Sequence, residues 1–250
     1  MRAVPMRGAR LLAVPASGDT ARLWLLPQRA AWWPDGETLF VADVHLGKAA
    51  AFRAAGLAVP GGTTADNLQR LSALVEALGA RRLVVLGDWL HARASLTPAV
   101  QQAVAAWRAR HAALACVLVR GNHDDHAGDP PASWGFTVVS EPWPLGPWEC
   151  RHTPPDGLDA AAGPDPDPRA QRPVLCGHRH PVCVVRAPGR DRLRLPCFAL
   201  DGPVLCLPAF GAWTGGHPVP AAPGVQRWAI ADDTLWPLEG PVAPWRALEP

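Results

Sequence analysis

The segment Arg82-Leu83-Val84-Val85-Leu86-Gly87-Asp88-Trp89-Leu90-His91 joins a short apolar run, rich in β-branched residues, to a polar loop. Such a run followed by glycine is typical of a buried strand that ends in a loop, and ligands collect at the carboxyl ends of strands in α/β sheets. Residues 37–41 lead into Asp43 in the same way, and residues 114–119 lead into Asn122. The sequence therefore predicts three strands that each end on polar side chains.

Helical patterns lie between these strands. Residues 64–78 have leucines at helical spacing, and Gly79 follows as a C-terminal stop. Thr97 and Pro98 are typical of a helix start, and the basic residues 108–111 suit a helix end. His111 is accordingly expected to be a cation at that helix end. The first half therefore has the pattern β-α-β-α-β.

After about residue 134 the pattern changes to strands without long helices, which suits a second, mixed sheet. The expected strands cover residues 136–140, 148–152, 173–176, 182–186, 192–195, 198–200 and 204–207. We therefore expect an α/β fold, a four-layer α-β-β-α sandwich in which two mixed sheets share one core between helices. With 250 residues, 48% of them hydrophobic, one domain over residues 1–250 is feasible, although the length would also permit two.

Composition limits the setting in which the protein works. The segment Thr153 to Arg172 is rich in Pro, Asp, Ala and Gly and is expected to be a mobile surface insertion, with a lid over the site as the alternative. The six cysteines stand among apolar neighbours and suit reduced core thiols. No apolar run approaches the ~20 residues of a membrane span, so a cytoplasmic protein is expected. A formal net charge of +2 gives no support for a nucleic-acid partner.

Four short motifs carry the chemistry. They are Asp43-Val44-His45, Gly87-Asp88-Trp89-Leu90-His91, Gly121-Asn122-His123-Asp124 and Gly177-His178-Arg179-His180. A two-metal site that hydrolyses phosphate esters needs oxygen and imidazole ligands, one carboxylate that can bridge two cations, and an imidazole left over for proton transfer. The four motifs supply all of these in order along the chain. They therefore indicate a two-metal phosphoesterase.

These motifs resemble those of the calcineurin-like metallophosphoesterase superfamily, and longer stretches are similar to one branch of it, the ligase-associated DNA damage response endonucleases. The stretches are Ala42-Asp43-Val44-His45-Leu46-Gly47-Lys48-Ala49-Ala50 with Phe52-Arg53, Gly87-Asp88-Trp89-Leu90-His91, Gly177-His178-Arg179-His180-Pro181, and Leu207-Pro208-Ala209-Phe210-Gly211 with Thr214-Gly215-Gly216. The likeness covers roughly residues 35–216. The bulky Trp89-Leu90 and the Pro-rich segment from Thr153 depart from it.

The resemblance implies the roles of the site residues. A first metal would be held by Asp43, His45, Asp88 and His180, and a second by Asp88, Asn122, His152 and His178, with Asp88 as the bridge. A hydroxide between the metals is the expected nucleophile, and His123 the general acid that protonates the leaving alkoxide. Asp124 is expected to fix the tautomer of His123. His152 stands outside the motifs, and a strand-end histidine held by hydrogen bonds would have the same sequence context.

Substrate contacts are less determined by the residues. Lys48 and Arg53 follow the first motif and are candidate phosphate contacts, with surface charges as the alternative. His91 is expected to orient a neighbour or to meet substrate. Arg186, Arg190, Arg192 and Arg194 could follow a phosphodiester backbone, but they also suit a solvated face of a hairpin.

The resemblance also implies a DNA substrate, manganese as the metal, and a working association with a DNA ligase, an exonuclease and a helicase in repair. The oligomeric state is left open. Two other functions remain possible from the residues alone. A small-molecule phosphoesterase (a nucleotide phosphodiesterase, a phosphomonoesterase or a nucleotide-sugar pyrophosphatase) would share every ligand, and a non-catalytic scaffold would keep the fold. An open groove favours polynucleotide, a closed apolar pocket favours a small ligand, and the intact His123 argues against the scaffold.

Overall fold

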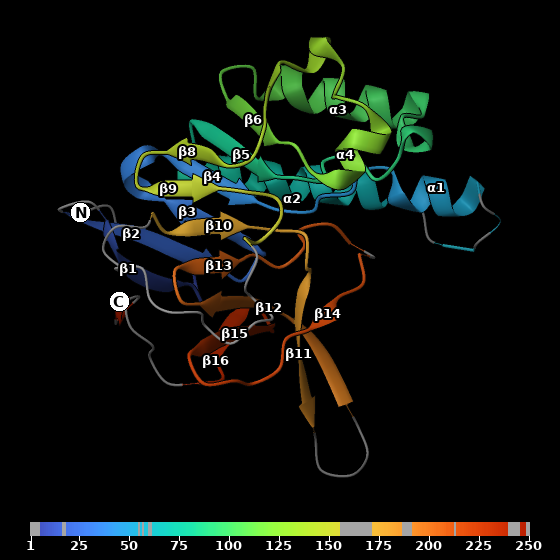
Figure 1. Cartoon of the computed structure of the whole chain (residues 1–250). Coiled ribbons are helices and arrows are strands. Elements are labelled where there is room, and N and C mark those ends of the chain that lie inside the picture. The colour runs from blue at the N-terminus through green and yellow to red at the C-terminus, as the bar shows by residue number, and fades with distance from the viewer. Residues whose placement is uncertain are drawn as a thin grey trace.

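The computed structural model describes residues 6–16, 19–54, 56, 58–59, 62–155, 172–186, 192–212, 214–239 and 246–248. Its strands are β1 (Arg10–Ala16), β2 (Asp19–Leu26), β3 (Ala30–Trp33), β4 (Thr38–Val41), β5 (Arg82–Leu86), β6 (Ala115–Val119), β7 (Phe136–Val139), β8 (Trp143–Leu145), β9 (Trp148–Cys150), β10 (Val174–Cys176), β11 (Pro181–Arg186), β12 (Arg192–Asp201), β13 (Val204–Cys206), β14 (His217–Pro218), β15 (Val225–Ala231), β16 (Thr234–Pro237) and β17 (Arg246–Leu248). Its α-helices are α1 (Lys48–Ala54), α2 (Thr63–Leu78), α3 (Pro98–Arg110) and α4 (Asn122–Ala127) (Figure 1).

The first sheet has the order β17-β1-β2-β3-β4-β5-β6-β7. The predicted strands β4, β5 and β6 lie side by side and parallel, so their carboxyl ends share one edge. Strands β1 to β3, which the sequence analysis did not predict, extend the sheet with antiparallel pairings. The assignment of residues 136–140 to the second sheet was wrong, because β7 pairs in parallel with β6. An apolar run of this kind can pair with a parallel strand in either sheet, so the sequence pattern does not predict which sheet the strand joins.

The second sheet has the order β14-β11-β12-β13-β10-β9-β8, with β15 paired to β12 and β16 to β15. It contains both parallel and antiparallel pairs, so it is mixed, as predicted. Strand β12 belongs to two parts of the sheet, since its first half pairs with β11 and its second half with β13 and β15. Strands β11 and β12 form the expected hairpin, which extends beyond the other strands of the second sheet (Figure 1).

Two layers of core hold these elements together. One lies between the first sheet and the helices and includes Leu71 and Leu74 of α2 and Trp107 of α3. The other lies between the two sheets, where residues such as Phe40 and Phe198 are fully buried. This confirms the prediction that two mixed β-sheets share a core in an α/β fold.

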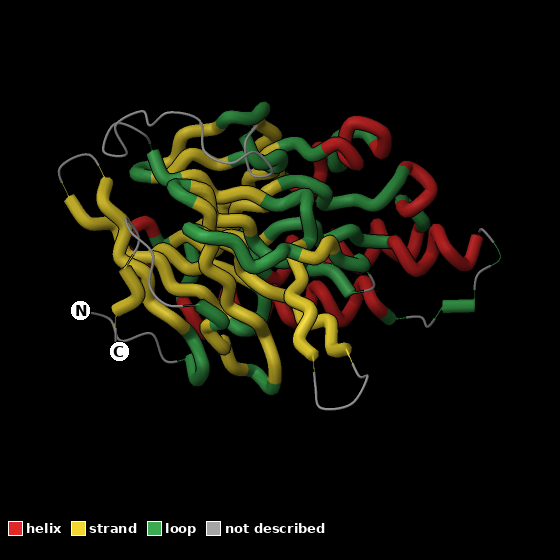
Figure 2. The backbone as a smooth tube through the Cα atoms, turned by 60° about the horizontal axis from the view of Figure 1, so that its bottom comes forward, coloured by secondary structure: helices red, strands yellow, loops and turns green. Residues whose placement is uncertain are grey.

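The described α-helices all come from residues 48–127, and Figure 2 shows the long helices gathered on one side of the molecule. The outer face of the second sheet is instead covered partly by Val219, which packs on the cluster around Val174 and Cys206. The α/β class with two mixed sheets is as predicted, and the α-helices of the described residues come from the first half of the chain.

Local sequence signals account for the helix ends. Gly79 ends α2 in the left-handed conformation with φ 63°, and Thr97 caps α3 by accepting the N–H of Val100. All six cysteines are buried and free, as expected of reduced core thiols. No helix in the described part of the chain has the length and apolar character needed to cross a membrane. The proposed insertion from residue 153 lies, for residues 156–171, outside the described residues.

Candidate metal centre

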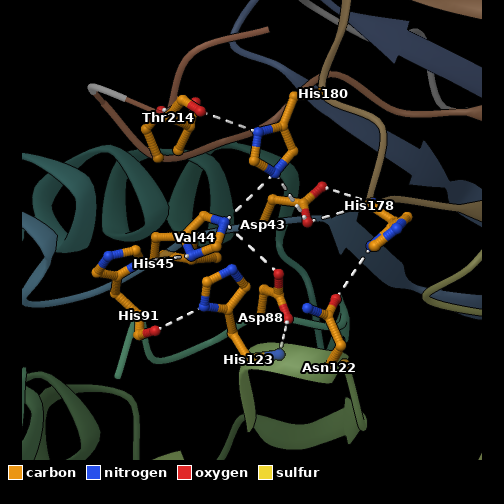
Figure 3. A network of polar contacts seen from close by, with 12 residues as sticks. Asp43, Val44, His45, Asp88, His91, Asn122, His123, His178, His180 and Thr214 are labelled. Carbon is orange, nitrogen blue, oxygen red and sulfur yellow. Dashed lines mark hydrogen bonds and ion pairs between the residues drawn. The ribbon is translucent and has the colours of Figure 1, made fainter. Parts of the chain in front are cut away.

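The polar motifs meet where the two sheets adjoin (Figure 3). Asp43, Asp88 and Asn122 follow β4, β5 and β6 of the first sheet, whereas His152 and His178 follow β9 and β10 of the second. The loops after β4 and β5 are bonded to each other, since the N–H of Asp43 donates to the carbonyl of Gly87 at 3.1 Å. Neighbouring strand ends therefore place the side chains of distant motifs together.

The first group of side chains is Asp43, His45, Asp88 and His180, and one ligand atom from each lies within 4.8 Å of all the others. Nε2 of His45 is 3.3 Å from Nε2 of His180 and 3.6 Å from a carboxylate oxygen of Asp88. Nε2 of His180 is 3.3 Å from a carboxylate oxygen of Asp43. Two imidazoles and two carboxylates that converge on one point suit a divalent transition metal. This set coincides with the first ligand set that the resemblance implied.

The second group brings together the remaining candidate ligands. Nε2 of His152 and Nδ1 of His178 lie 2.9 and 3.0 Å from the side-chain oxygen of Asn122 and 3.0 Å from each other. Oδ1 of Asp88 is 3.5 Å from Nε2 of His152, whereas its Oδ2 faces His45. The two oxygens of Asp88 therefore face different groups, as a bridge between two cations requires.

The backbone of the centre is held in an unusual conformation. Asp43, His45, Asp88, His178 and His180 all have positive φ, between 46° and 70°. Residues other than glycine rarely adopt this left-handed region, and each such residue costs of the order of 1 kcal/mol or more. Tight turns of this kind allow two ligands to project from one short loop, as Asp43 and His45 do. The concentration of strain in these loops marks them as a functional site.

A glycine makes the close approach to Asp88 possible. A Cβ atom added to Gly121 would lie 2.4 Å from Oδ1 of Asp88 and 2.6 Å from its backbone nitrogen. Only glycine therefore fits between the bridging carboxylate and the loop that carries Asn122.

The expected contact between Asp124 and the His123 ring is wrong. The carboxylate of Asp124 accepts backbone N–H groups of Asp88, Trp89, Leu90 and Gly121 at 2.8 to 3.3 Å. It is therefore committed to the backbone of the loop that presents Asp88. Nδ1 of His123 is instead 2.7 Å from the carbonyl oxygen of His91 (Figure 3). Since a carbonyl only accepts, Nδ1 carries the proton and Nε2 is the atom left for proton exchange.

Burial shifts the pKa of several side chains in the centre. Asp43, His45, Asp88 and His152 are buried, at 0 to 3% exposure. Burial, followed by the charge of Lys48, lowers the pKa of His45, which is therefore neutral and able to donate a lone pair. Burial raises the pKa of Asp88, while His152 opposes that shift. Burial alone would lower the pKa of His180, but the hydrogen bond with Asp43, the charge of Asp43 and the carbonyl of Thr214 together raise it.

Several supporting contacts had no signal in the sequence, because their partners are backbone groups. The carbonyls of Leu86 and Thr214 lie 3.1 Å from Nδ1 of His152 and 3.0 Å from Nδ1 of His180, so they orient both rings. Glu141 accepts the N–H of His152 at 2.6 Å and thereby fixes the strand end that carries it.

The candidate substrate residues have different surroundings. His91 stacks on His123 with ring centres 5.0 Å apart, and its Nδ1 is 3.4 Å from Nδ1 of His45. Lys48 is close enough for the charges of Asp88 and Asp43 to act on its pKa, which burial lowers. Nη1 of Arg53 donates to the carbonyl of Val59 at 3.5 Å.

The arginines of the hairpin are only partly described. Arg192 and Arg194 are exposed, and Arg194 donates to the carbonyl of Gly216 at 2.7 Å. Arg190 and the side chain of Arg186 lie outside the described residues.

The centre is open on one side. Asn122 and His178 are exposed, whereas the buried members of the centre are Asp43, His45, Asp88 and His152. The exposed side chains leave the centre accessible to a phosphate group. The buried carboxylates lie in a medium of low dielectric constant, where electrostatic interactions are stronger than in water.

The chain is similar to known proteins. The model of the calcineurin-like phosphoesterase family matches residues 37–180, which contain every candidate ligand named above. The crystal structure of the nuclease MPE from Pseudomonas putida is similar, with a TM-score of 0.72 and 42% sequence identity over 91% of this chain and 100% of that chain. Yfce, a phosphoesterase from E. coli, is 17% identical over 79% of this chain and 95% of that chain, with a TM-score of 0.39. No curated protein matches the sequence.

The family match and the likeness to a nuclease are consistent with the endonuclease branch that the sequence resembles. The convergent Asp and His side chains fit divalent metals, and the enzyme is a metal-dependent hydrolase of phosphoric esters. The chain belongs to the calcineurin-like phosphoesterase family.

Proposed function

We propose that this protein is a two-metal phosphodiesterase that cleaves DNA as an endonuclease in repair. The observation that carries the hydrolytic part is the position of Asp88, whose two carboxylate oxygens face separate sets of ligands. Asp43, His45, Asp88 and His180 would hold one metal, and Asp88, Asn122, His152 and His178 the other. Bound metals would lower the pKa of a water molecule and offset the charge of the phosphate oxygens.

The proton for the leaving group comes from His123 in this proposal. Its backbone N–H donates to Oδ1 of Asp88 at 2.9 Å, so the ring stands beside the bridging carboxylate. The carbonyl of His91 holds the proton on Nδ1, which leaves Nε2 to carry the proton given to the alkoxide. Asp124 acts on this arrangement indirectly, through the backbone of the loop that carries Asp88. It is a positioning residue.

The DNA substrate is supported by two observations. The similar structure from Pseudomonas putida is that of a nuclease. The exposed positions of Asn122 and His178 favour a long substrate over a small ligand enclosed in a pocket. Lys48, His91 and Arg53 are the side chains that we propose as substrate contacts beside the metals, and the charges of Asp88 and Asp43 act on the pKa of Lys48.

Manganese, and a working association with a DNA ligase, an exonuclease and a helicase, belong to the proposal because the sequence resembles the ligase-associated endonucleases. Imidazole, amide and carboxylate ligands are compatible with manganese, but other divalent metals also accept them.

The test is incubation of metal-stripped protein with supercoiled plasmid and manganese, magnesium or zinc, beside a small activated phosphodiester. We expect manganese to support nicking of the plasmid and His123→Ala to abolish it. Hydrolysis of the small ester without any nicking would overturn the DNA substrate and leave the phosphoesterase. No hydrolysis of either substrate with metals bound would favour a non-catalytic scaffold.

A further inference from the structure

Two half-buried arginines lie at the metal end of the first sheet, on the side of β3. Arg29 precedes β3, and the antiparallel pairing of β3 with β4 places it about level with Ala42, the residue before Asp43. Arg70 reaches the same place from α2. Neither side chain has a role in the metal centre described above.

The contacts of both arginines converge on one segment. Nη1 of Arg29 is 3.5 Å from the carbonyl oxygen of Ala209, and Nη1 of Arg70 donates to the carbonyl of Phe210 at 3.0 Å. The segment they share is bonded to the strand that carries Asp43, because the N–H of Phe210 donates to the carbonyl of Ala42 at 2.8 Å. The arginine pair is therefore separated from the strand of Asp43 by only about one to two strand spacings, roughly 5 to 10 Å.

No carboxylate within the described ranges forms an ion pair with Arg29 or Arg70. Their acceptors are carbonyls and the amide oxygen of Asn67, and the Arg70 guanidinium also lies over the Phe210 ring, 4.2 Å from its centre. Burial, followed by the charge of Arg29, lowers the pKa of Arg70 to about 10, so both groups stay charged at neutral pH. Two like charges that are partly desolvated and lack an anion are unfavourable, and an oxyanion with planar acceptor geometry would relieve both.

The positive φ of Arg29, 66°, belongs to the tight hairpin loop between β2 and β3, where its N–H donates to the carbonyl of Leu26 at 3.0 Å. The loop fixes the place of Arg29 at the end of the hairpin.

We propose that Arg29 and Arg70 bind a phosphate of the polynucleotide next to the one that is cleaved. This inference rests on the proposed function and names a contact that extends the substrate path beyond the metals, on the β3 side. Guanidinium groups suit this contact because they donate two parallel hydrogen bonds to a phosphate. The small activated phosphodiester has no neighbouring phosphate, so its hydrolysis does not use the pair.

The experiment compares Arg29→Ala, Arg29→Lys and Arg70→Lys with the wild-type protein on a single-stranded oligonucleotide, on plasmid and on the small diester. Arg81→Ala is the matched control, because Arg81 is an exposed arginine just before β5, at the amino-terminal end of this strand and away from the metal centre. We expect Arg29→Ala to raise KM for the polynucleotide about tenfold without changing kcat. Both lysine variants should lose less, since they keep the charge without the planar fork.

A second measurement separates a phosphate contact from a general loss of structure. The slope of log affinity against log salt should fall by about 0.7 to 0.9 in Arg29→Ala, because one phosphate contact is lost. Hydrolysis of the small diester should equal that of the wild type. Unchanged KM and salt slope in variants of an enzyme that cleaves polynucleotide would overturn this inference alone. Cleavage of the small diester with no binding or cleavage of polynucleotide by the wild type would overturn the proposed function and this inference together.

Discussion

Oδ1 of Asp88 accepts the backbone N–H of His123 at 2.9 Å, so the proposed bridging ligand and the proposed proton donor are directly bonded to each other. The same carboxylate oxygen lies 3.5 Å from Nε2 of His152. A change at Asp88 therefore acts on both metal sites and on the position of His123. This coupling leads to the first prediction.

Asp88→Asn should reduce hydrolysis of the small phosphodiester by at least about a hundredfold, because an amide is a poor bridge between two cations. The measurement is the initial rate at saturating metal, beside the metal content after dialysis. Asp125→Asn is the matched control, since Asp125 is exposed on the neighbouring helix and forms an ion pair with Arg120. Equal losses in both variants would contradict the role of Asp88.

Asp124→Asn should destabilise the protein by about 2 to 3 kcal/mol and weaken metal binding about 10- to 100-fold. The amide keeps one acceptor oxygen but turns an NH₂ group toward backbone N–H groups that the carboxylate now satisfies. Burial raises the pKa of Asp124 to about 6, which shows how little water reaches this carboxyl. Urea unfolding and metal titration would measure the two effects. Loss of stability with unchanged metal affinity would limit Asp124 to the fold.

Gly121→Ala should displace the Asp88 carboxylate, since the added Cβ would meet Oδ1 at 2.4 Å. We expect a loss of stability of about 1 to 3 kcal/mol together with weaker metal binding. Gly79→Ala is the control, because it places an alanine at positive φ with no atom within 4 Å. It should cost about 1 kcal/mol and leave metal affinity unchanged. Calorimetric metal titration of both variants is the deciding measurement.

Metal should stabilise the folded protein, because the complete ligand sets exist only in that state. At a free metal concentration one hundred times Kd, the gain is about 2.7 kcal/mol, which corresponds to a rise in Tm of roughly 5 to 10 °C for a chain of this size. Thermal unfolding with metal and then with chelator would measure it. A variant with His45→Ala should show a much smaller shift, and an equal shift would contradict the assigned ligands.

The metal-free protein should lose stability below about pH 6.5 through His111. Burial, opposed by Glu76 and aided by Arg110 and Arg108, lowers the pKa of this histidine, whose Nε2 is 2.7 Å from the hydroxyl of Ser72. A lowered folded-state pKa means that the unfolded chain binds more protons, so this stability is present above pH 6.5 and declines as pH falls. Urea unfolding in chelator from pH 7.5 to 5 should show a smaller decline for His111→Gln. The exposed His217→Gln should behave as the wild type.

The sequence allowed the strands β4, β5 and β6 to be predicted, because an apolar run precedes each of the first three polar motifs. The structure brings the side chains of the predicted ligands together, and their binding of metal stays a prediction. It could not reveal that Asp124 serves backbone donors, since a carboxylate next to a histidine has the same sequence pattern whichever group it contacts. His111 was misjudged for a related reason. Its place after Arg110 indicates a solvated helix end, but the packing of α3 on α2 buries it against Ser72.

The arrangement of strands was predictable only where neighbours in sequence are neighbours in space. Strand β7 follows β6 and joins it, but the apolar run of residues 136–139 carries no mark of the sheet to which it belongs. Strands β1 to β3 extend the first sheet with antiparallel pairings, and β3 joins it by pairing with β4. Such long-range pairing depends on the whole chain, so no local pattern reports it.

The ligands come from both sheets, and His45 and His180, which face each other at 3.3 Å, stand 135 residues apart in the chain. Metals bound there would act as a cross-link that closes a very long loop of polypeptide. The two sheets could then separate only after the cations depart. The lifetime of the folded enzyme would accordingly be set by the rate of metal release, and a protease or a denaturant would meet a kinetic barrier that equilibrium stability alone does not describe.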